Sequence, residues 1–97
     1  MKAGLILFAH GARDPRWAEP FEAVAARVRT QCPQVEVHLA FLEFMAPTLP
    51  VAGELLTAAG CQRVEVLPLF LGAGGHVRRD LPLLLDDLRA RHAGVRW

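Results

Sequence analysis

The chain has no long apolar run, no strong net charge and few cysteines, and each absence excludes a class of protein. No uninterrupted apolar stretch approaches the roughly 18 residues that a membrane-spanning helix needs, so we expect no membrane span. The formal net charge of the 97-residue chain is +1, and its 11 basic residues are spread along the sequence, which leaves no basic surface for nucleic acid. The two cysteines, Cys32 and Cys61, are too far apart in the sequence for a metal-binding motif. Reduced thiols in the cytoplasm are the simplest expectation.

What remains is the composition of a small globular domain. Hydrophobic residues make up 53% of the chain and charged residues 22%, which is typical of a folded protein rather than a disordered one. A chain of this length forms one domain whose core alone gives limited stability, so we expect residues 1–97 to be a single domain that self-associates.

Apolar stretches bounded by turn residues predict strands. They are Ala3–Ala9, Val35–Leu42 and Arg63–Leu71, with Val95–Trp97 as the start of a fourth. The first and third are continuous enough to be buried on both faces of a parallel sheet. The second alternates, which is typical of a strand with one face on the core.

Helical spacing of apolar residues predicts a helix between each pair of strands. Asp14 and Pro15 predict the start of the first helix, whose regular part should run from near Glu19 to near Cys32. Thr48 precedes the second helix, which stops at Gly60, and Asp80 with Pro82 opens the third, which stops at Gly94. The residues predicted to face the core are Trp17, Phe21, Val24, Ala25 and Val28, then Ala52, Leu55, Leu56 and Ala59, then Leu81, Leu84, Leu85 and Leu88.

Strand and helix alternate throughout, which predicts an α/β sandwich of three layers around a parallel sheet of about four strands. Right-handed crossovers bring the carboxyl ends of all its strands to one edge, where such sheets bind ligands. His10, Glu43 and His76 each follow a predicted strand. Three glycines between positions 72 and 75 let the backbone before His76 bend sharply or approach a ligand.

Two imidazoles at the ends of neighbouring strands can bind one metal ion, since such strands are roughly 5 Å apart and metal–nitrogen distances are about 2 Å. Imidazole with carboxylate suits divalent iron, cobalt, nickel or zinc better than calcium or magnesium. The alternative is that each side chain is structural: a hydrogen-bonded histidine, an exposed Glu43, and solvated arginines at Arg78 and Arg79. We interpret His38 and His92 as structural or surface residues.

Three motifs resemble those of the small, single-domain sirohydrochlorin chelatases, which belong to the class II chelatases. They are Phe8-Ala9-His10-Gly11-Ala12-Arg13-Asp14, Phe41-Leu42-Glu43 with Pro47, and Leu67-Pro68-Leu69-Phe70-Leu71 running into Gly74-Gly75-His76-Val77 with Asp80. The resemblance implies a chelatase fold, metal binding by His10 and His76, and a homodimer. It implies insertion of a divalent metal into sirohydrochlorin, most commonly cobalt for cobalamin, with iron for siroheme and nickel for coenzyme F430 as close relatives. Small members of the family usually continue through a complete fourth strand and a final helix. Because this sequence stops at Trp97, we expect either a fragment or a fold that is finished differently.

Metal insertion assigns a role to each candidate residue. We expect His10, Glu43 and His76 to be catalytic, with Glu43 accepting a proton, and the metal to be a substrate with no organic cofactor. Arg13, Arg78 and the glycine-loop amides at Gly74 and Gly75 are expected to contact the carboxylates of the tetrapyrrole.

Two other functions compete with the chelatase. One is a carrier that binds metal or tetrapyrrole without turnover. The other is a phosphatase that uses His10 as nucleophile and Arg13 as a phosphate clamp, although Ala9 stands where an arginine is expected.

Overall fold

The computed structural model describes the backbone of residues 2–69 and 75–97, and the side chains of residues 2–69 and 80–97. Its strands are β1 (Ala3–Ala9), β2 (Val35–Phe41) and β3 (Arg63–Leu69). Its helices are the 3₁₀ helix η1 (Pro15–Ala18), α1 (Glu19–Gln31), α2 (Leu49–Ala58) and α3 (Gly75–Arg91). The predicted alternation of strand and helix is therefore confirmed.

The strands form a parallel sheet in the order β2-β1-β3. Ala3 of β1 lies opposite Val35 of β2 and Arg63 of β3, and Ala9 lies opposite Phe41 and Leu69. The first and third predicted strands are thus neighbours that end together. The predicted start of a fourth strand is also present: Arg96 forms a parallel bridge with Arg63, and the Val64 N–H donates to the Arg96 carbonyl at 2.7 Å.

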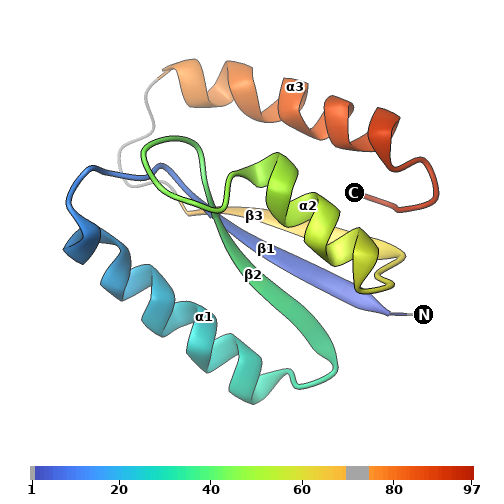
Figure 1. Ribbon diagram of the computed structural model, residues 1–97, viewed down its shortest axis with the longest axis horizontal. Helices are drawn as coiled ribbons and strands as arrows, with labels where there is room; N and C mark the ends of the chain where they lie inside the picture. The colour runs from blue at the N-terminus through green and yellow to red at the C-terminus, as the bar shows by residue number, and fades with distance from the viewer. Residues whose placement is uncertain (1, 70–74) are drawn as a thin grey trace.

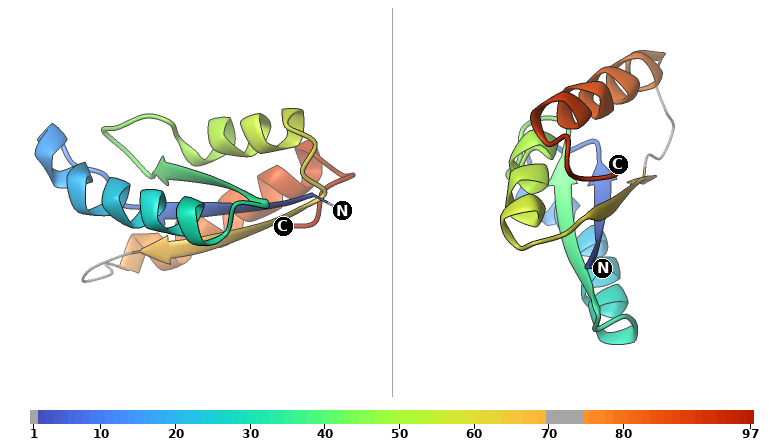
Figure 2. Two further views of the ribbon diagram at one scale, coloured as in Figure 1. Left: turned by 90° about the horizontal axis from the view of Figure 1, so that it is seen from below. Right: turned by 90° about the vertical axis from the view of Figure 1, so that its right-hand side faces the viewer.

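Helices cover both faces of the sheet, which gives three layers (Figures 1 and 2). On one face, α2 and α3 pack through Leu49, Leu56 and Leu88 onto Ile6 and Phe8 of β1. On the other face, α1 packs onto a second apolar cluster. That cluster contains Leu7, Ala9, Ala25, Val37, Leu39 and Phe41, with Trp17, Phe21 and Val28 against it. The predicted three-layer α/β sandwich is confirmed.

Several predicted helix boundaries are confirmed. Asp14 caps η1 by accepting a hydrogen bond from the Arg16 N–H, and α1 begins at Glu19. Thr48 is the N-cap of α2, although its side chain makes no capping hydrogen bond. Gly60 follows α2 with a φ of +92°, a conformation that glycine adopts readily.

The predicted start of α3 at Asp80 is wrong. The helix begins at Gly75, so that Asp80 and Pro82 lie inside it. A proline inside a helix removes the hydrogen bond to the carbonyl four residues earlier and disfavours helix at the residue before it, so the sequence signal favoured a start near Pro82. The helix tolerates this cost here. The helix also ends at Arg91, three residues before Gly94. The predicted leucine face is confirmed: Leu88 is buried, with Leu81, Leu84 and Leu85 packed against the same cluster.

Three predictions of burial are wrong. Val24 on α1, Leu55 on α2 and Ala59 at the end of α2 are exposed. The buried side of α2 runs instead through Leu49, Ala52, Gly53 and Leu56. The third strand is also less buried than predicted within the described residues: Val64 is buried but Leu67 is 49% exposed. Among the described residues, those that pack on the α1 side of the sheet come mainly from β1 and β2, with Leu69 from β3.

Among the residues that the structure describes, no helix is both long and apolar enough to cross a membrane.

The contrast between two adjacent leucines tests the packing of α2. Leu56 is fully buried and Leu55 is 47% exposed. Leu56→Ala should lower the free energy of unfolding by about 3 kcal/mol, because it leaves a cavity among α2, α3 and β1. Leu55→Ala should change it by less than about 1 kcal/mol. Urea denaturation of both variants measures the difference, and equal losses would show that α2 faces the sheet differently.

Candidate metal-handling site

The connections after β1 and β2 meet at the carboxyl edge of the sheet (Figure 1). The Leu42 N–H donates to the Ala9 carbonyl at 3.0 Å, and the Glu43 N–H donates to the His10 carbonyl at 3.1 Å. These two hydrogen bonds continue the pairing of β1 with β2 for two residues beyond both strands. As a result, His10 and Glu43 are held side by side.

The side chains of His10 and Glu43 contact each other directly. Nε2 of His10 lies 3.3 Å from Oε1 of Glu43, and Nδ1 lies 3.2 Å from the carbonyl oxygen of Gly11. Both side chains remain accessible, with 36% of the imidazole and 47% of the carboxylate exposed. The sequence prediction that these two residues converge at one edge of the sheet is therefore confirmed.

The spacing of this pair suits a shared cation as well as a direct contact. Two ligand atoms that each bind one ion at about 2 Å in a tetrahedral arrangement are roughly 3.3 Å apart. A neutral imidazole supplies one lone pair and a carboxylate supplies negative charge, a donor set suited to first-row transition metals. Among residues 2–69 and 80–97, however, no group of three or more histidine, cysteine or acidic side chains is placed to hold a metal.

The predicted second imidazole, that of His76, lies outside the described side chains. β3 ends at Leu69, opposite Ala9, and His76 is the second residue of α3. The side chains of His76 and Arg78 lie outside the described residues, as does Gly74 altogether, while Gly75 is the first residue of α3. The convergence of His76 with His10 stays a prediction.

Gly11 has a structural role that the sequence analysis missed. Its φ is +95°, and a Cβ atom at this position would collide with the carbonyl oxygen of Glu43. Any other residue would therefore push apart the two connections that hold His10 and Glu43. The signal in the sequence was the glycine directly after the histidine, but only the fold identifies what approaches it.

Arg13 and Phe44 form a second contact between the same two connections. The guanidinium of Arg13 lies over the ring of Phe44, 5.1 Å from its centroid. Arg16, in contrast, is ion-paired with Asp14, at 3.0 Å from Nη2 to Oδ2. The side chain and the N–H of Arg16 hold the pKa of Asp14 below its ordinary value. The sequence analysis selected Arg13 but not Phe44.

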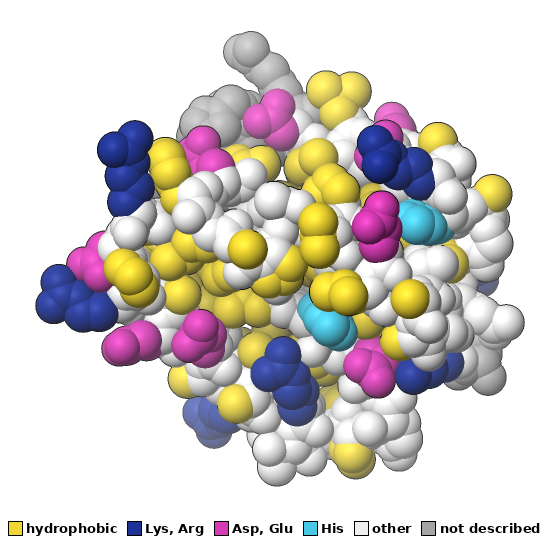
Figure 3. Space-filling model, in the orientation of Figure 1, with side chains coloured by type: hydrophobic (Ala, Val, Ile, Leu, Met, Phe, Trp, Pro, Cys, Tyr) yellow, Lys and Arg dark blue, Asp and Glu magenta, His cyan; other side chains and the backbone are white. Residues whose placement is uncertain are grey.

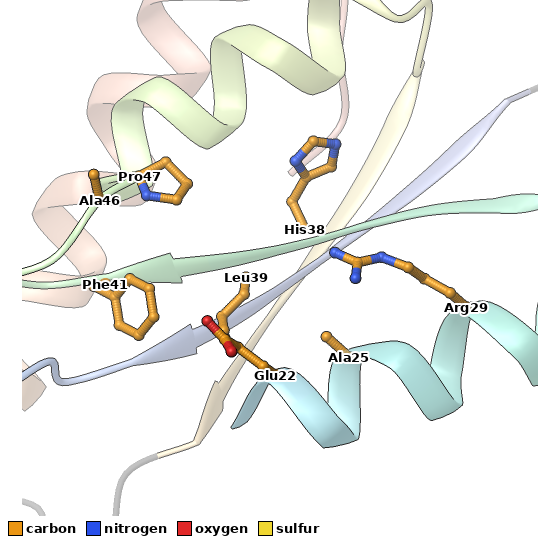
Figure 4. Close-up of a pocket in the computed structure, with 8 residues that line it drawn as sticks. All are labelled: Glu22, Ala25, Arg29, His38, Leu39, Phe41, Ala46 and Pro47. Atoms are coloured by element: carbon orange, nitrogen blue, oxygen red, sulfur yellow. The ribbon is translucent and has the colours of Figure 1, made fainter. Parts of the chain in front are cut away.

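The surface between α1 and the segment after β2 is hollowed. Figure 3 shows hydrophobic side chains gathered between α1 and the segment after β2, with charged side chains around them. A pocket of about 440 Å³ lies at the outer edge of β2 (Figure 4). It is lined by Glu22, Ala25 and Arg29 of α1, His38, Leu39 and Phe41 of β2, and Ala46 and Pro47. Arg29 donates two hydrogen bonds to the carbonyl of Val37, at 3.1 and 3.0 Å, which covers part of this strand edge.

Two glycines with similar backbone angles test the role of Gly11. Gly11→Ala should destabilise the protein at least twice as much as Gly60→Ala, since φ is positive at both positions but only Gly11 faces a carbonyl oxygen. The conformational penalty alone is roughly 1–2 kcal/mol. Urea denaturation of both variants gives the comparison, and similar losses would mean that the connections can separate freely.

Comparison with known proteins agrees with this architecture. The chain is 36% identical to a sirohydrochlorin cobaltochelatase of Saccharolobus solfataricus over 95 residues, which are 94% of this chain and 73% of that protein. It superimposes on a cobalamin (vitamin B12) biosynthesis CbiX protein of Marinobacter aquaeolei VT8 with a TM-score of 0.81 and 35% identity, covering 97% of this chain and 76% of the other.

A more distant structure shares the fold. The cobalt complex of the sirohydrochlorin chelatase SirB of Bacillus subtilis subspecies spizizenii matches with a TM-score of 0.85 and 22% identity. The match covers 98% of this chain and 41% of SirB, so the chain spans less than half of that protein.

The CbiX family model matches residues 4–97, which include both connections that carry His10 and Glu43. With the relatives above, that match over nearly the whole chain shows that the protein belongs to the CbiX family.

Proposed function

We propose that this protein is a metal chelatase that inserts a divalent metal, cobalt first and iron or nickel as alternatives, into sirohydrochlorin. The observation that carries the proposal is the 3.3 Å pair of His10 and Glu43 at the carboxyl edge of a CbiX-family sheet. A cobaltochelatase at 36% identity supports both the substrate and the choice of metal. The product would enter the synthesis of cobalamin or of siroheme.

The chemistry divides between the two side chains. Insertion replaces two N–H protons of the tetrapyrrole with one M²⁺ ion, so the protein must release the metal and accept protons. Neutral His10 binds the ion through Nε2, with His76 as the proposed second ligand, and leaves other coordination positions open for the pyrrole nitrogens. Glu43, in contact with the same nitrogen, accepts one pyrrole proton, and solvent takes the other.

The remaining residues of the site bind the substrate in this proposal. Sirohydrochlorin carries many carboxylates, and Arg13, Arg78 and the backbone amides of Gly74 and Gly75 would contact them. A homodimer would enclose the macrocycle more fully than one small domain can. Cys32 and Cys61 are both free thiols, in keeping with a reducing compartment such as the cytoplasm.

Family membership favours this function over the phosphatase. In addition, Ala9 directly precedes His10, where the phosphatase interpretation expects an arginine.

An anaerobic insertion assay with cobalt and sirohydrochlorin tests the metal-binding role of His10. His10→Ala should lower the rate of cobalt insertion about 100-fold, as should His76→Ala, because the ion loses a nitrogen ligand. His38→Ala is the matched control: this histidine is paired with Glu36 on β2 and should leave the rate unchanged. Equal rates for His10→Ala and His38→Ala would contradict the proposal. Formation of only one metallated ring per chain would identify a carrier instead.

Replacement of the carboxylate separates proton transfer from metal binding. Glu43→Gln keeps the size of the side chain and removes the base, so kcat should fall about 100-fold while the affinity for cobalt changes less. Glu36→Gln, which changes a half-buried carboxylate on β2 that is paired with Lys2, is the control. Steady-state rates and cobalt titration give the two quantities. Loss of cobalt affinity with an unchanged kcat would reassign Glu43 to binding alone.

A further inference from the structure

Phe44 has an unusual backbone conformation and an exposed ring. Its φ is +68°, in the left-handed region that a bulky side chain rarely adopts. The residue is 56% exposed. Neighbouring side chains reach the interior: Leu42 packs against the core cluster under α2 and α3, and Met45 against the cluster under α1. Phe44 belongs to neither cluster, so packing in the core does not account for its position.

The backbone around Phe44 is fixed on both sides. Before it, Leu42 and Glu43 donate to the carbonyls of Ala9 and His10. After it, the chain turns back to the end of β2, where the Phe41 N–H donates to the Pro47 carbonyl at 2.9 Å. These bonds hold the tight turn that contains Phe44, and they maintain a conformation that is unfavourable for this residue. The ring is therefore presented at the surface directly after the Glu43 carboxylate.

Arg13 gives this aromatic surface a positive charge. The guanidinium over the ring is a cation–π contact, which restricts the arginine without neutralising it. No carboxylate among the described residues lies within ion-pair distance of Arg13, whereas neighbouring Arg16 is paired with Asp14. A ligand with a carboxylate can thus bind Arg13 without displacing an internal partner.

Arg13 and Phe44 also line a pocket. It holds about 310 Å³ and is lined by Ala12, Arg13, Pro15, Ala18, Glu22, Phe41, Phe44, Met45 and Ala46. Phe41, Glu22 and Ala46 also line the pocket at the edge of β2, so the two hollows are adjacent. On the connections that follow His10 and Glu43, the surface therefore offers an exposed ring, a cation and a recess with both apolar and charged lining residues.

We propose that Arg13 and Phe44 form a positioning site for the tetrapyrrole, in which the Phe44 ring packs on the flat macrocycle and Arg13 binds one peripheral carboxylate. This inference rests on the proposed function. The contact orients the ring so that its nitrogens face His10 and Glu43. Phe44 is a positioning residue, because its ring sets the position of the substrate and does not contact the reacting atoms.

Binding of metal-free sirohydrochlorin, followed by its absorption and fluorescence, tests the role of Phe44. Phe44→Gly should raise the Kd about tenfold, because the stacking surface is lost. The same variant should keep or raise the melting temperature, because glycine adopts positive φ without a penalty. Phe44→Tyr should restore the affinity. Leu55→Ala, which removes another exposed apolar side chain away from the site, should not change the Kd.

The charge of Arg13 is tested in the same titration. Arg13→Gln should raise the Kd and weaken its dependence on salt, since screening acts on the charge pair that is removed. Arg16→Gln should do neither. Wild-type affinity in both Phe44→Gly and Arg13→Gln would overturn the inference while leaving metal insertion intact. Absence of any sirohydrochlorin binding by the wild-type protein would overturn the inference together with the proposed function.

Discussion

The site depends on the continuation of β1–β2 pairing beyond the two strands. Two backbone hydrogen bonds, from Leu42 to Ala9 and from Glu43 to His10, place the imidazole and the carboxylate at 3.3 Å. The close approach requires a glycine at position 11, since a side chain there would meet the Glu43 carbonyl. Thus a backbone constraint, set by one residue without a side chain, determines the geometry of the two side chains that carry the chemistry.

The same constraint explains why the site can be both exposed and well placed. The described residues contain no buried polar or charged side chain, so neither His10 nor Glu43 is positioned by burial. The rigid element is the sheet edge beneath them, where Ala9, Ala40 and Phe41 are buried between the helical layers. Accessible donors on a rigid backbone suit a site that must receive an ion and then release it to a large ring.

Much of this arrangement follows from the sequence because its signals are local. Apolar runs predicted the strands, and Asp14 with Pro15 predicted the start of η1. Because the strands are parallel, the residues that follow them, His10 and Glu43, lie at the same edge of the sheet. The failures depend on tertiary contacts. Helical periodicity alone could not distinguish Leu55 from Leu56, because the choice depends on where α3 and β1 lie. The left-handed Phe44 and the carbonyl that faces Gly11 have no local signal, since both result from hydrogen bonds between distant segments.

The central claim is that the His10–Glu43 pair handles a divalent metal. The most direct measurement is the anomalous difference map of crystals grown anaerobically and soaked with cobalt. The account predicts a cobalt peak about 2 Å from Nε2 of His10, on the side of the Glu43 carboxylate. Cobalt bound only at His38 or His92, with the His10–Glu43 contact unchanged, would contradict it.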